Sequence, residues 1–555
     1  MGDHRNNILD KYAAPVCYQV RLGMRRYGMA YTFDVIVIGS GFGGAITSCR
    51  LSEKNQRVLV LERGRRWKPT EFPRAPGDPW IYDHNQPQLL NGWVDFRFFE
   101  RMIVAQGAGV GGGSLIYANI SKEPPKSVFD SGWPPEITRA SLQPYYDTVG
   151  KMLQVQPLPD NQLSPHFQFF RDAATAAGYQ DRFFKPPLAI SFDPNYSYDR
   201  PNPTSNKYTV VHKNPQGVEQ GTCVQCGNCD IGCQVLAKNT LDLNYIPLGE
   251  QHGLEVRHLH VVTRIEPYDQ GYRVSYDRLE NGERIPGDET ARIVIVAGGT
   301  VNTNELMLRC RDEYKTLPKI SQTLGDGFSA NGDFISASFE QPQTVDPTVG
   351  PTITAALDFF DGSVNGQRFF IEDGGSPNWG RDMCRKFLVE AAKAGRGGEV
   401  IKELKKLASE PNDAFPHAAL WFAVGMDAAD GQFYLGRKLF WPWERKLRLK
   451  WNPETAKPLA NAEYGIQQQM ATVTGGKPIP QILWVDFMTL VTAHPLGGCH
   501  MGSDPSHGVV DHTGQVFGYK NLYIADGSIV PTSVGFNPSR TIGALAERIA
   551  DLMPV

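Results

Sequence analysis

The clearest hydrophobic pattern in the chain is a short apolar run that ends in a cluster of glycines. Residues 33–38, FDVIVI, are rich in valine and isoleucine, which predicts a strand buried on both faces. The segment Gly39-Ser-Gly-Phe-Gly-Gly44 follows directly, and a stretch long enough for a helix comes after it. A second apolar run, Arg57 to Leu61, predicts the next strand and ends at Glu62. This order of strand, glycine turn, helix and strand predicts a parallel sheet with a crossover helix.

The same segment has the chemistry of a dinucleotide-binding site. Gly39 permits a tight turn, Gly41 lets the backbone approach a pyrophosphate, and Gly44 lets the helix pack against the strand. The free N–H groups and the dipole of the helix N-terminus favour phosphate. Glu62 is placed to accept hydrogen bonds from a ribose. Both NAD and FAD fit this fingerprint.

A second strand and helix near the C-terminus favour FAD. Asn521 to Ala525 predicts a strand, Asp526 and Gly527 follow it, and a helix is expected from about Thr541. A chain that returns to its first sheet with its last residues is typical of large flavoproteins.

Composition narrows the class of protein. A chain of 555 residues predicts about two to four domains, or one large interleaved pair. A net charge of −3 gives no field that would attract nucleic acid or an anionic membrane, and no apolar run is long enough for a membrane span. The first 33 residues carry charges throughout and lack the apolar core of a signal peptide, so we expect an extension, a cytoplasmic location and reduced thiols.

Several further motifs, in order along the chain, carry a family resemblance. With the fingerprint, they resemble the glucose–methanol–choline (GMC) oxidoreductases, and among them the cholesterol-oxidase-like branch. These motifs are AGVGGGSLIYAN at 108–119, AKNTL at 237–241, IVAGG at 295–299, HPLGGC at 494–499 and GFNP at 535–538.

The resemblance implies an α/β fold in which a Rossmann-type FAD-binding domain is built from discontinuous segments and an α+β substrate-binding domain is inserted. After the extension at 1–33, the FAD-binding segments are 34–120, 221–315 and 488–555, and the substrate-binding segments are 121–220 and 316–487. The resemblance places these further residues at the cofactor: Gly109, Gly112, Gly113, Ser114, Asn119, Val262, Asp526, Gly527 and Asn537. A glycine-rich surface loop at 108–119 and a plain core valine at 262 are the alternatives.

Alcohol oxidation by a flavin moves a hydride to flavin N5 and a proton to a base, and the resemblance implies which side chains take part. His494 matches the family's active-site histidine, and Asn537 matches the second polar group, where asparagine points to sterol oxidation. Glu372, after an apolar run, is the candidate carboxylate for moving a double bond; the alternative is a strand-end acid. A metal site made of the C-terminal histidines and Cys499 is disfavoured, because their spacing fits no ligand pattern.

Four cysteines, Cys223, Cys226, Cys229 and Cys233, fall within eleven residues. Their C-x2-C-x2-C-x3-C spacing is that of bacterial ferredoxins, but Gln234 follows the last cysteine where ferredoxins have proline. Zinc is less natural in so short a tract, and the expected compartment disfavours disulfides. An iron–sulfur cluster and free thiols that pack a loop both remain open.

These observations predict FAD-dependent oxidation of an apolar alcohol, above all a 3β-hydroxysterol, to the ketone, followed by a double-bond shift where Glu372 acts. Aromatic stretches at 420–424 and 440–443 fit an apolar pocket. The electron acceptor is oxygen or an external acceptor. The alternatives are a dehydrogenase that passes electrons through an iron–sulfur cluster, a flavin and iron–sulfur carrier without alcohol oxidation, and a non-catalytic FAD- or lipid-binding protein.

Overall fold

The computed structural model describes residues 31–75, 78–377, 416–437, 445–479, 481, 484 and 488–555. Residues 1–30 of the predicted extension and the aromatic stretch at 440–443 lie outside the described residues. Among the residues described, no helix is long and apolar enough to cross a membrane.

The first apolar run forms the centre of a seven-stranded sheet. Strand β1 (Phe33–Ile38) pairs in parallel with β2 (Val58–Leu61) on one side and with β11 (Glu283–Val296) on the other. The last four residues of β1 and all of β2 are buried, as continuous apolar runs predict. The other strands are β8 (Glu255–Arg257), β9 (His260–Tyr268), β10 (Gly271–Glu280) and β21 (Leu522–Ile524).

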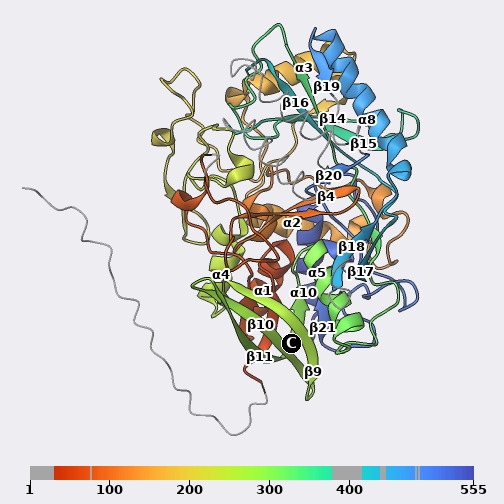
Figure 1. Ribbon diagram of the computed structural model, residues 1–555. Helices are drawn as coiled ribbons and strands as arrows, with labels where there is room; N and C mark the ends of the chain where they lie inside the picture. Colours follow the sequence, from red (N-terminus) through yellow and green to blue (C-terminus); the bar gives the residue numbers. More distant parts are fainter. Residues whose placement is uncertain are drawn as a thin grey trace, which may run out of the picture.

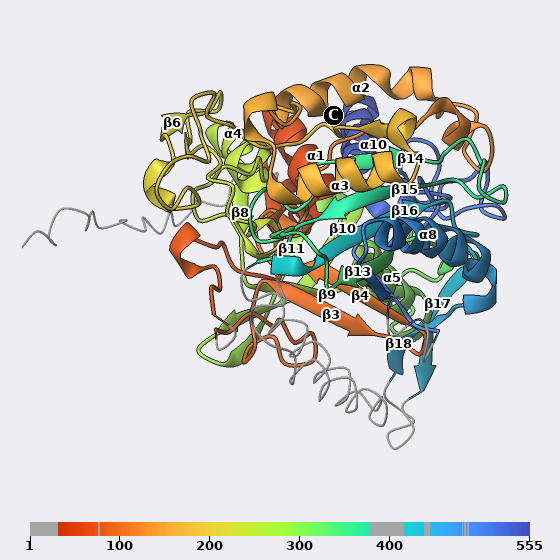
Figure 2. The same ribbon diagram turned by 90° about the horizontal axis from the view of Figure 1, so that it is seen from above.

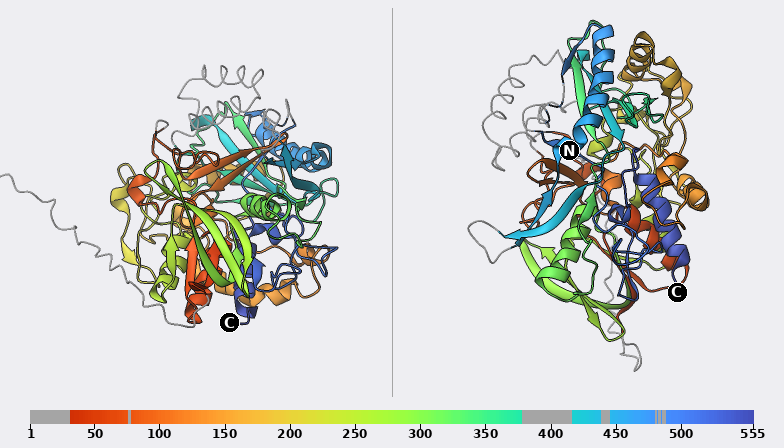
Figure 3. Two further views of the ribbon diagram at one scale, coloured as in Figure 1. Left: turned by 60° about the horizontal axis from the view of Figure 1, so that its bottom comes forward. Right: turned by 90° about the vertical axis from the view of Figure 1, so that its right-hand side faces the viewer.

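Helices from both ends of the chain cover this sheet. Helix α1 (Phe42–Glu53) packs against α10 (Ser539–Leu552), and the two lie side by side in both views of Figure 3. Arg50 on α1 donates two hydrogen bonds to Glu547 on α10, at 2.7 and 2.9 Å. Helix α2 (Arg139–Met152) packs on α10, and α4 (Tyr245–Gln251) packs on α1. The C-terminal residues therefore complete the unit that the N-terminal fingerprint begins.

A six-stranded antiparallel sheet lies at the other end of the molecule (Figure 1). Its face is covered by the 21-residue helix α8 (Pro453–Val473) and by α3 (Pro165–Ala176), which Figure 2 shows from above. In spatial order the strands are β19 (Lys477–Ile479), β13 (Phe334–Phe339), β16 (Ala419–Gly425), β15 (Phe369–Gly374), β14 (Ala356–Asp358) and β5 (Phe183–Phe184).

Three smaller sheets complete the strands of the described residues. In Figure 1 β4 (Met102–Gly107) and β20 (Leu490–Thr492) lie between the two large sheets, and helix α5 (Thr300–Leu308) follows β11. The small sheets consist of β20 (Leu490–Thr492), β4 (Met102–Gly107) and β3 (Val94–Phe98); of β12 (Asp326–Phe328), β17 (Gly431–Arg437) and β18 (Arg445–Lys450); and of β6 (His212–Lys213) and β7 (Glu219–Gln220). Both large sheets draw on separated parts of the chain, but the domain boundaries given above stay a prediction.

Candidate functional site

A cavity of about 810 Å³ lies between the two large sheets, at the ends of β1 and β11. Ligands of open parallel sheets bind at this edge, outside the carboxyl ends of the strands. Eleven of the residues predicted from the sequence line the cavity: Gly39, Gly41, Glu62, Gly112, Gly113, Val262, Glu372, His494, Asp526, Gly527 and Asn537.

Two glycine segments meet at the wall of this cavity. Gly39 has φ of +95°, and a Cβ there would lie 2.4 Å from the carbonyl oxygen of Ala297. A Cβ on Gly112, which has φ of +53°, would lie 2.5 Å from the Cα of Gly41. Only glycine fits such contacts, so the fingerprint and the 108–119 segment form one backbone cradle.

Glu62 and Asp526 are held rigidly beside the cradle. The carboxylate of Glu62 accepts hydrogen bonds from the backbone N–H and the hydroxyl of Ser40, at 3.0 and 2.7 Å, and from the N–H of Gly64. Asp526 accepts from the N–H of Gly299 at 2.9 Å and from the Thr303 hydroxyl. Burial raises the pKa of Asp526 above its usual range, against these hydrogen bonds.

Four predicted cofactor residues do not line the cavity. Gly44 packs α1 against β1, since a Cβ there would lie 2.0 Å from the Gly39 carbonyl oxygen. Gly109 lies against Trp67 with φ of +152°. Ser114 bonds the backbone of its own loop and of Leu241. Asn119 is fully buried, and neither polar atom of its side chain has a hydrogen-bond partner among the described residues.

The predicted catalytic pair, His494 and Asn537, is brought together from two loops 43 residues apart. The side-chain Nδ2 of Asn537 lies 3.4 Å from Nε2 of His494. On the far side of the ring, Nδ1 donates to the carboxylate of Asp333 at 2.7 Å, which fixes the ring and leaves Nε2 as the acceptor. Burial opposes the charged imidazolium, but Asp333 and Glu372 together outweigh burial, so the pKa of His494 is raised.

Glu372 lies on β15 with its side chain in the same cavity. Burial raises its pKa to about 8, partly offset by nearby His494. One oxygen of Glu372 and the side-chain oxygen of Asn537 are buried and have no hydrogen-bond partner among the described residues. Buried orphan atoms on a cavity wall are groups that a bound molecule would satisfy.

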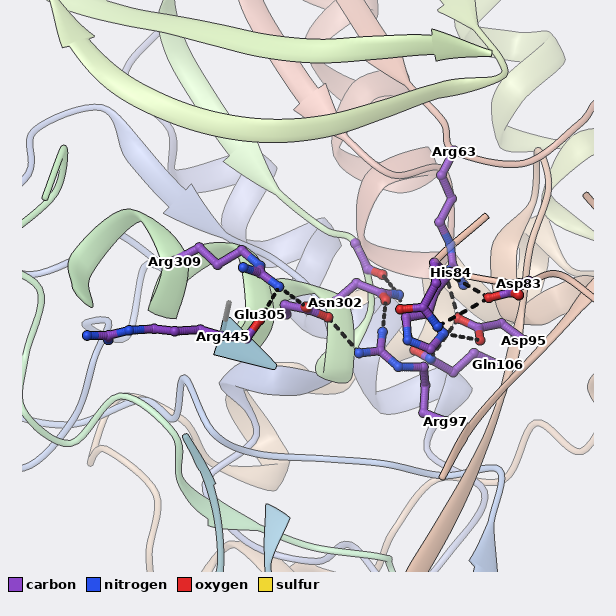
Figure 4. A network of polar contacts seen from close by, with 12 residues as sticks. Arg63, Asp83, His84, Asp95, Arg97, Gln106, Asn302, Glu305, Arg309 and Arg445 are labelled. Carbon is purple, nitrogen blue, oxygen red and sulfur yellow. Dashed lines mark hydrogen bonds and ion pairs between the residues drawn. The ribbon is translucent and has the colours of Figure 1, made fainter. Parts of the chain in front are cut away.

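A charged network forms another part of the wall, and nothing in the sequence pattern pointed to it. Figure 4 shows Arg97 between Glu305 and Asn302, with Gln106 continuing the chain of contacts toward Asp95 and Arg63. Arg97 donates to Glu305 at 2.6 Å, and Arg309 donates to the same carboxylate at 2.9 Å. These contacts tie the β3–β4 sheet to α5 across one side of the cavity.

The four clustered cysteines line a second, much smaller cavity of about 20 Å³, together with Lys238. All four are free thiols; the N–H of Gln225 bonds the sulfur of Cys223 at 3.3 Å, and the N–H of Ala237 bonds that of Cys233 at 3.2 Å. Among the residues described, no group of three or more His, Cys, Asp or Glu side chains could hold a metal ion. The iron–sulfur cluster therefore stays a prediction.

Comparison with known proteins bears on this site directly. Residues 33–186 and 452–546 match the GMC oxidoreductase family. A cholesterol oxidase from Acinetobacter baumannii is 30% identical, with 94% of this chain and 95% of the relative covered. The chain belongs to the GMC oxidoreductase family. A cholesterol oxidase from Mycobacterium tuberculosis is also 30% identical, over 94% of this GMC oxidoreductase and 91% of the relative.

Solved structures agree on the fold. Pyridoxine 4-oxidase from Mesorbium loti superposes with a TM-score of 0.61 at 15% identity, over 93% of this chain and 98% of that one. The predicted α/β fold with an FAD-binding unit is thus confirmed. This GMC oxidoreductase is a flavin-dependent alcohol oxidoreductase, and FAD is its cofactor. The close glycine cradle and the orphan polar atoms fit that cofactor and its substrate.

Proposed function

We propose that this GMC oxidoreductase oxidises the hydroxyl group of a 3β-hydroxysterol to the ketone. The observation that carries the proposal is the meeting of His494, Asn537 and Glu372 at one end of a cavity whose nearby wall is apolar. Ile335, Ile353, Phe422 and Val424 supply that wall. An apolar wall suits a sterol, whereas a sugar would require many paired polar groups.

The chain's own residues divide the work at the reacting hydroxyl. Bound FAD supplies the hydride acceptor. In the neutral form of His494 the Nδ1–H is committed to Asp333, so Nε2 is the unprotonated nitrogen and accepts the hydroxyl proton. Asn537 orients the hydroxyl without adding a charge that would oppose hydride departure. Glu372 carries a proton from one ring carbon to another when the double bond moves.

Similar proteins support the sterol as substrate. The two relatives at 30% identity are both cholesterol oxidases. Asparagine at 537, where many family members have histidine, agrees with that branch.

Anaerobic mixing with sterols tests the proposal. A 3β-hydroxysterol should bleach the visible flavin band, whereas its 3α epimer and short aliphatic alcohols should bleach it at least about tenfold more slowly, as misplacing the reacting carbon predicts. Equal bleaching by all alcohols would contradict sterol specificity. The absence of bleaching by any of them would contradict alcohol oxidation.

A second candidate is a dehydrogenase that passes electrons out through an iron–sulfur cluster on the cysteine loop. One observation favours it: Asp230 of this loop lines the main cavity while the four thiols line the small one, so the loop separates the two. Iron and sulfide assays on protein purified without air test this candidate. Iron bound with flavin and lost in Cys229→Ser would support it, and iron-free protein of full activity would exclude it.

A further inference from the structure

Three buried polar side chains lie behind the His494–Asp333 pair. The proposed oxidation does not use any of them. Glu463 and Gln467 on α8 and Ser336 on β13 are each at most 3% exposed. One oxygen of Glu463, both amide atoms of Gln467 and the Ser336 hydroxyl have no hydrogen-bond partner among the described residues. Such groups are rare in proteins and are usually satisfied by ordered water.

These side chains share one space between a helix and a sheet. Glu463 and Gln467 are four residues apart, so they lie on the same face of α8, which packs on β13. The ring centroids of Phe334 and of Tyr464 on α8 lie 6.2 Å apart, so the Phe334 side chain faces this helix. Side chains alternate along a strand, so Ser336 points the same way as Phe334.

The same space reaches the loop that carries Asp333. A Cβ on Gly425 would lie 2.9 Å from the unpartnered oxygen of Glu463, and the Gly425 N–H bonds the carbonyl of Asn331, two residues before Asp333. The charged groups that act on Glu463 are Asp333 and Asp427, both acids. Burial, reinforced by these two carboxylates, raises the pKa of Glu463 well above its usual range.

We propose that Glu463, Gln467 and Ser336 hold ordered water between α8 and the Asp333 loop, and that Glu463 exchanges protons between the His494–Asp333 pair and solvent. The inference rests on the proposed alcohol oxidation. Bound substrate blocks access to Nε2 of His494 during the reaction. A proton route on the Nδ1 side therefore lets the imidazolium lose its extra proton before the product leaves.

Protons and electrons balance along this route. The alcohol O–H bond breaks and an N–H bond forms at Nε2, while the electron pair leaves with the hydride. The imidazolium then gives its Nδ1 proton to Asp333, 2.7 Å away, and water passes it to Glu463, which releases its own proton toward solvent. After the product leaves, Nε2 loses its proton to the open cavity and Nδ1 is reprotonated by the reverse passage.

Stopped-flow mixing with a pH-indicator dye under anaerobic conditions, at alkaline pH, tests the proposal on the FAD-loaded enzyme. In the unmodified protein, proton release should coincide with flavin bleaching. In Glu463→Gln, which can hold water but cannot exchange a proton, release should lag bleaching by about tenfold or more, the scale of losing a proton-transfer group. Gln467→Leu, which displaces water from the same helix face, should give the same lag.

Glu454→Gln is the matched control, because Glu454 is exposed on the first turn of α8; release should coincide with bleaching in it. Coincident release in both Glu463→Gln and Gln467→Leu would overturn the inference. A crystal structure with no water among Glu463, Gln467 and Ser336 would overturn it independently of activity. If no alcohol bleaches the unmodified protein, the proposed function fails, and the crystallographic water still decides this site.

Discussion

At the scale of single residues, His494 is the side chain on which the proposed chemistry most depends. Replacing it with alanine removes the acceptor for the hydroxyl proton, and we expect the rate of flavin reduction to fall by about 10²- to 10⁴-fold. FAD content should stay unchanged, because the substitution leaves the glycine cradle intact. Single-turnover bleaching measures the rate. His507→Ala is the control, since His507 is exposed, and a loss equal to that of His494→Ala would contradict the assignment.

Glu372 gives the site a pH dependence of its own. A pKa of about 8 means that the carboxyl is protonated below that pH and ionised above it. Taking a proton from a ring carbon requires the ionised form, so the fraction of product with a shifted double bond should rise as pH increases through about 8. Glu372→Gln should abolish the shift and leave the ketone. Product analysis across pH checks this, and a shifted fraction that is flat with pH would contradict it.

The sequence identified His494 and Asn537 because each lies in a motif with a recognisable resemblance, and the structure brings them together. Asp333 could not be found in this way: it lies in SANGDF, without a spacing that relates it to residue 494. Its role arises only when the loop before β13 folds against the loop after β20. Ser114 shows the opposite case, because a motif named it and the structure uses its hydroxyl to hold the loop.

At the scale of elements, the turn between β1 and α1 is set by its first glycine. An alanine at position 39 would have to adopt φ near +95° and would press its Cβ against Ala297. We expect Gly39→Ala to lose bound FAD and to lower the free energy of unfolding by about 1–3 kcal/mol or more. Gly465→Ala, on the open side of α8 with nothing within 4 Å, should instead be neutral or stabilising by up to about 1 kcal/mol.

Flavin absorbance of the purified variants measures bound FAD, and urea unfolding measures the free energy of unfolding. Retention of FAD by Gly39→Ala at normal stability would show that the turn tolerates a side chain.

Elements with a strong apolar pattern were predictable almost to the residue. The run at 33–38 is β1, and the strand expected at 521–525 is β21 (Leu522–Ile524). The helix expected from about Thr541 begins at Ser539. The order of strands in the six-stranded sheet was not predictable, because its pairing joins segments as far apart as β5 and β14, and no local signal encodes such contacts.

At the scale of the whole molecule, the fold depends on polar links between parts distant in sequence. Arg50 and Glu547 join the first and last helices, and the Tyr245 hydroxyl on α4 donates to the same carboxylate at 2.7 Å. The Arg97–Glu305–Arg309 group joins the β3–β4 sheet to α5 beside the cavity. The sequence could not reveal such pairs, because nothing in the local pattern around a charged residue indicates which distant residue it will contact.

Glu305 tests whether this second link stabilises the fold. Burial alone would raise its pKa, but Arg97 and Arg309 outweigh burial and lower the pKa to about 2. Glu305→Gln leaves the guanidinium of Arg97, only 5% exposed, without a counter-charge, so the free energy of unfolding should fall by about 3 kcal/mol. Glu313→Gln removes a more exposed partner of Arg309 and should cost only about 0.5 kcal/mol.

The sign of the pH dependence follows from the lowered pKa. A carboxyl that binds its proton more weakly when folded stabilises the protein above its ordinary pKa, here 4.5, and this stabilisation is lost as pH falls toward about 2. The stability gap between the unmodified protein and Glu305→Gln should therefore be constant near neutral pH and shrink below pH 4.5. Urea unfolding at a series of pH values measures the gap. A gap independent of pH would mean that Glu305 contributes packing rather than charge, and that the wall beside the cofactor is held by other contacts.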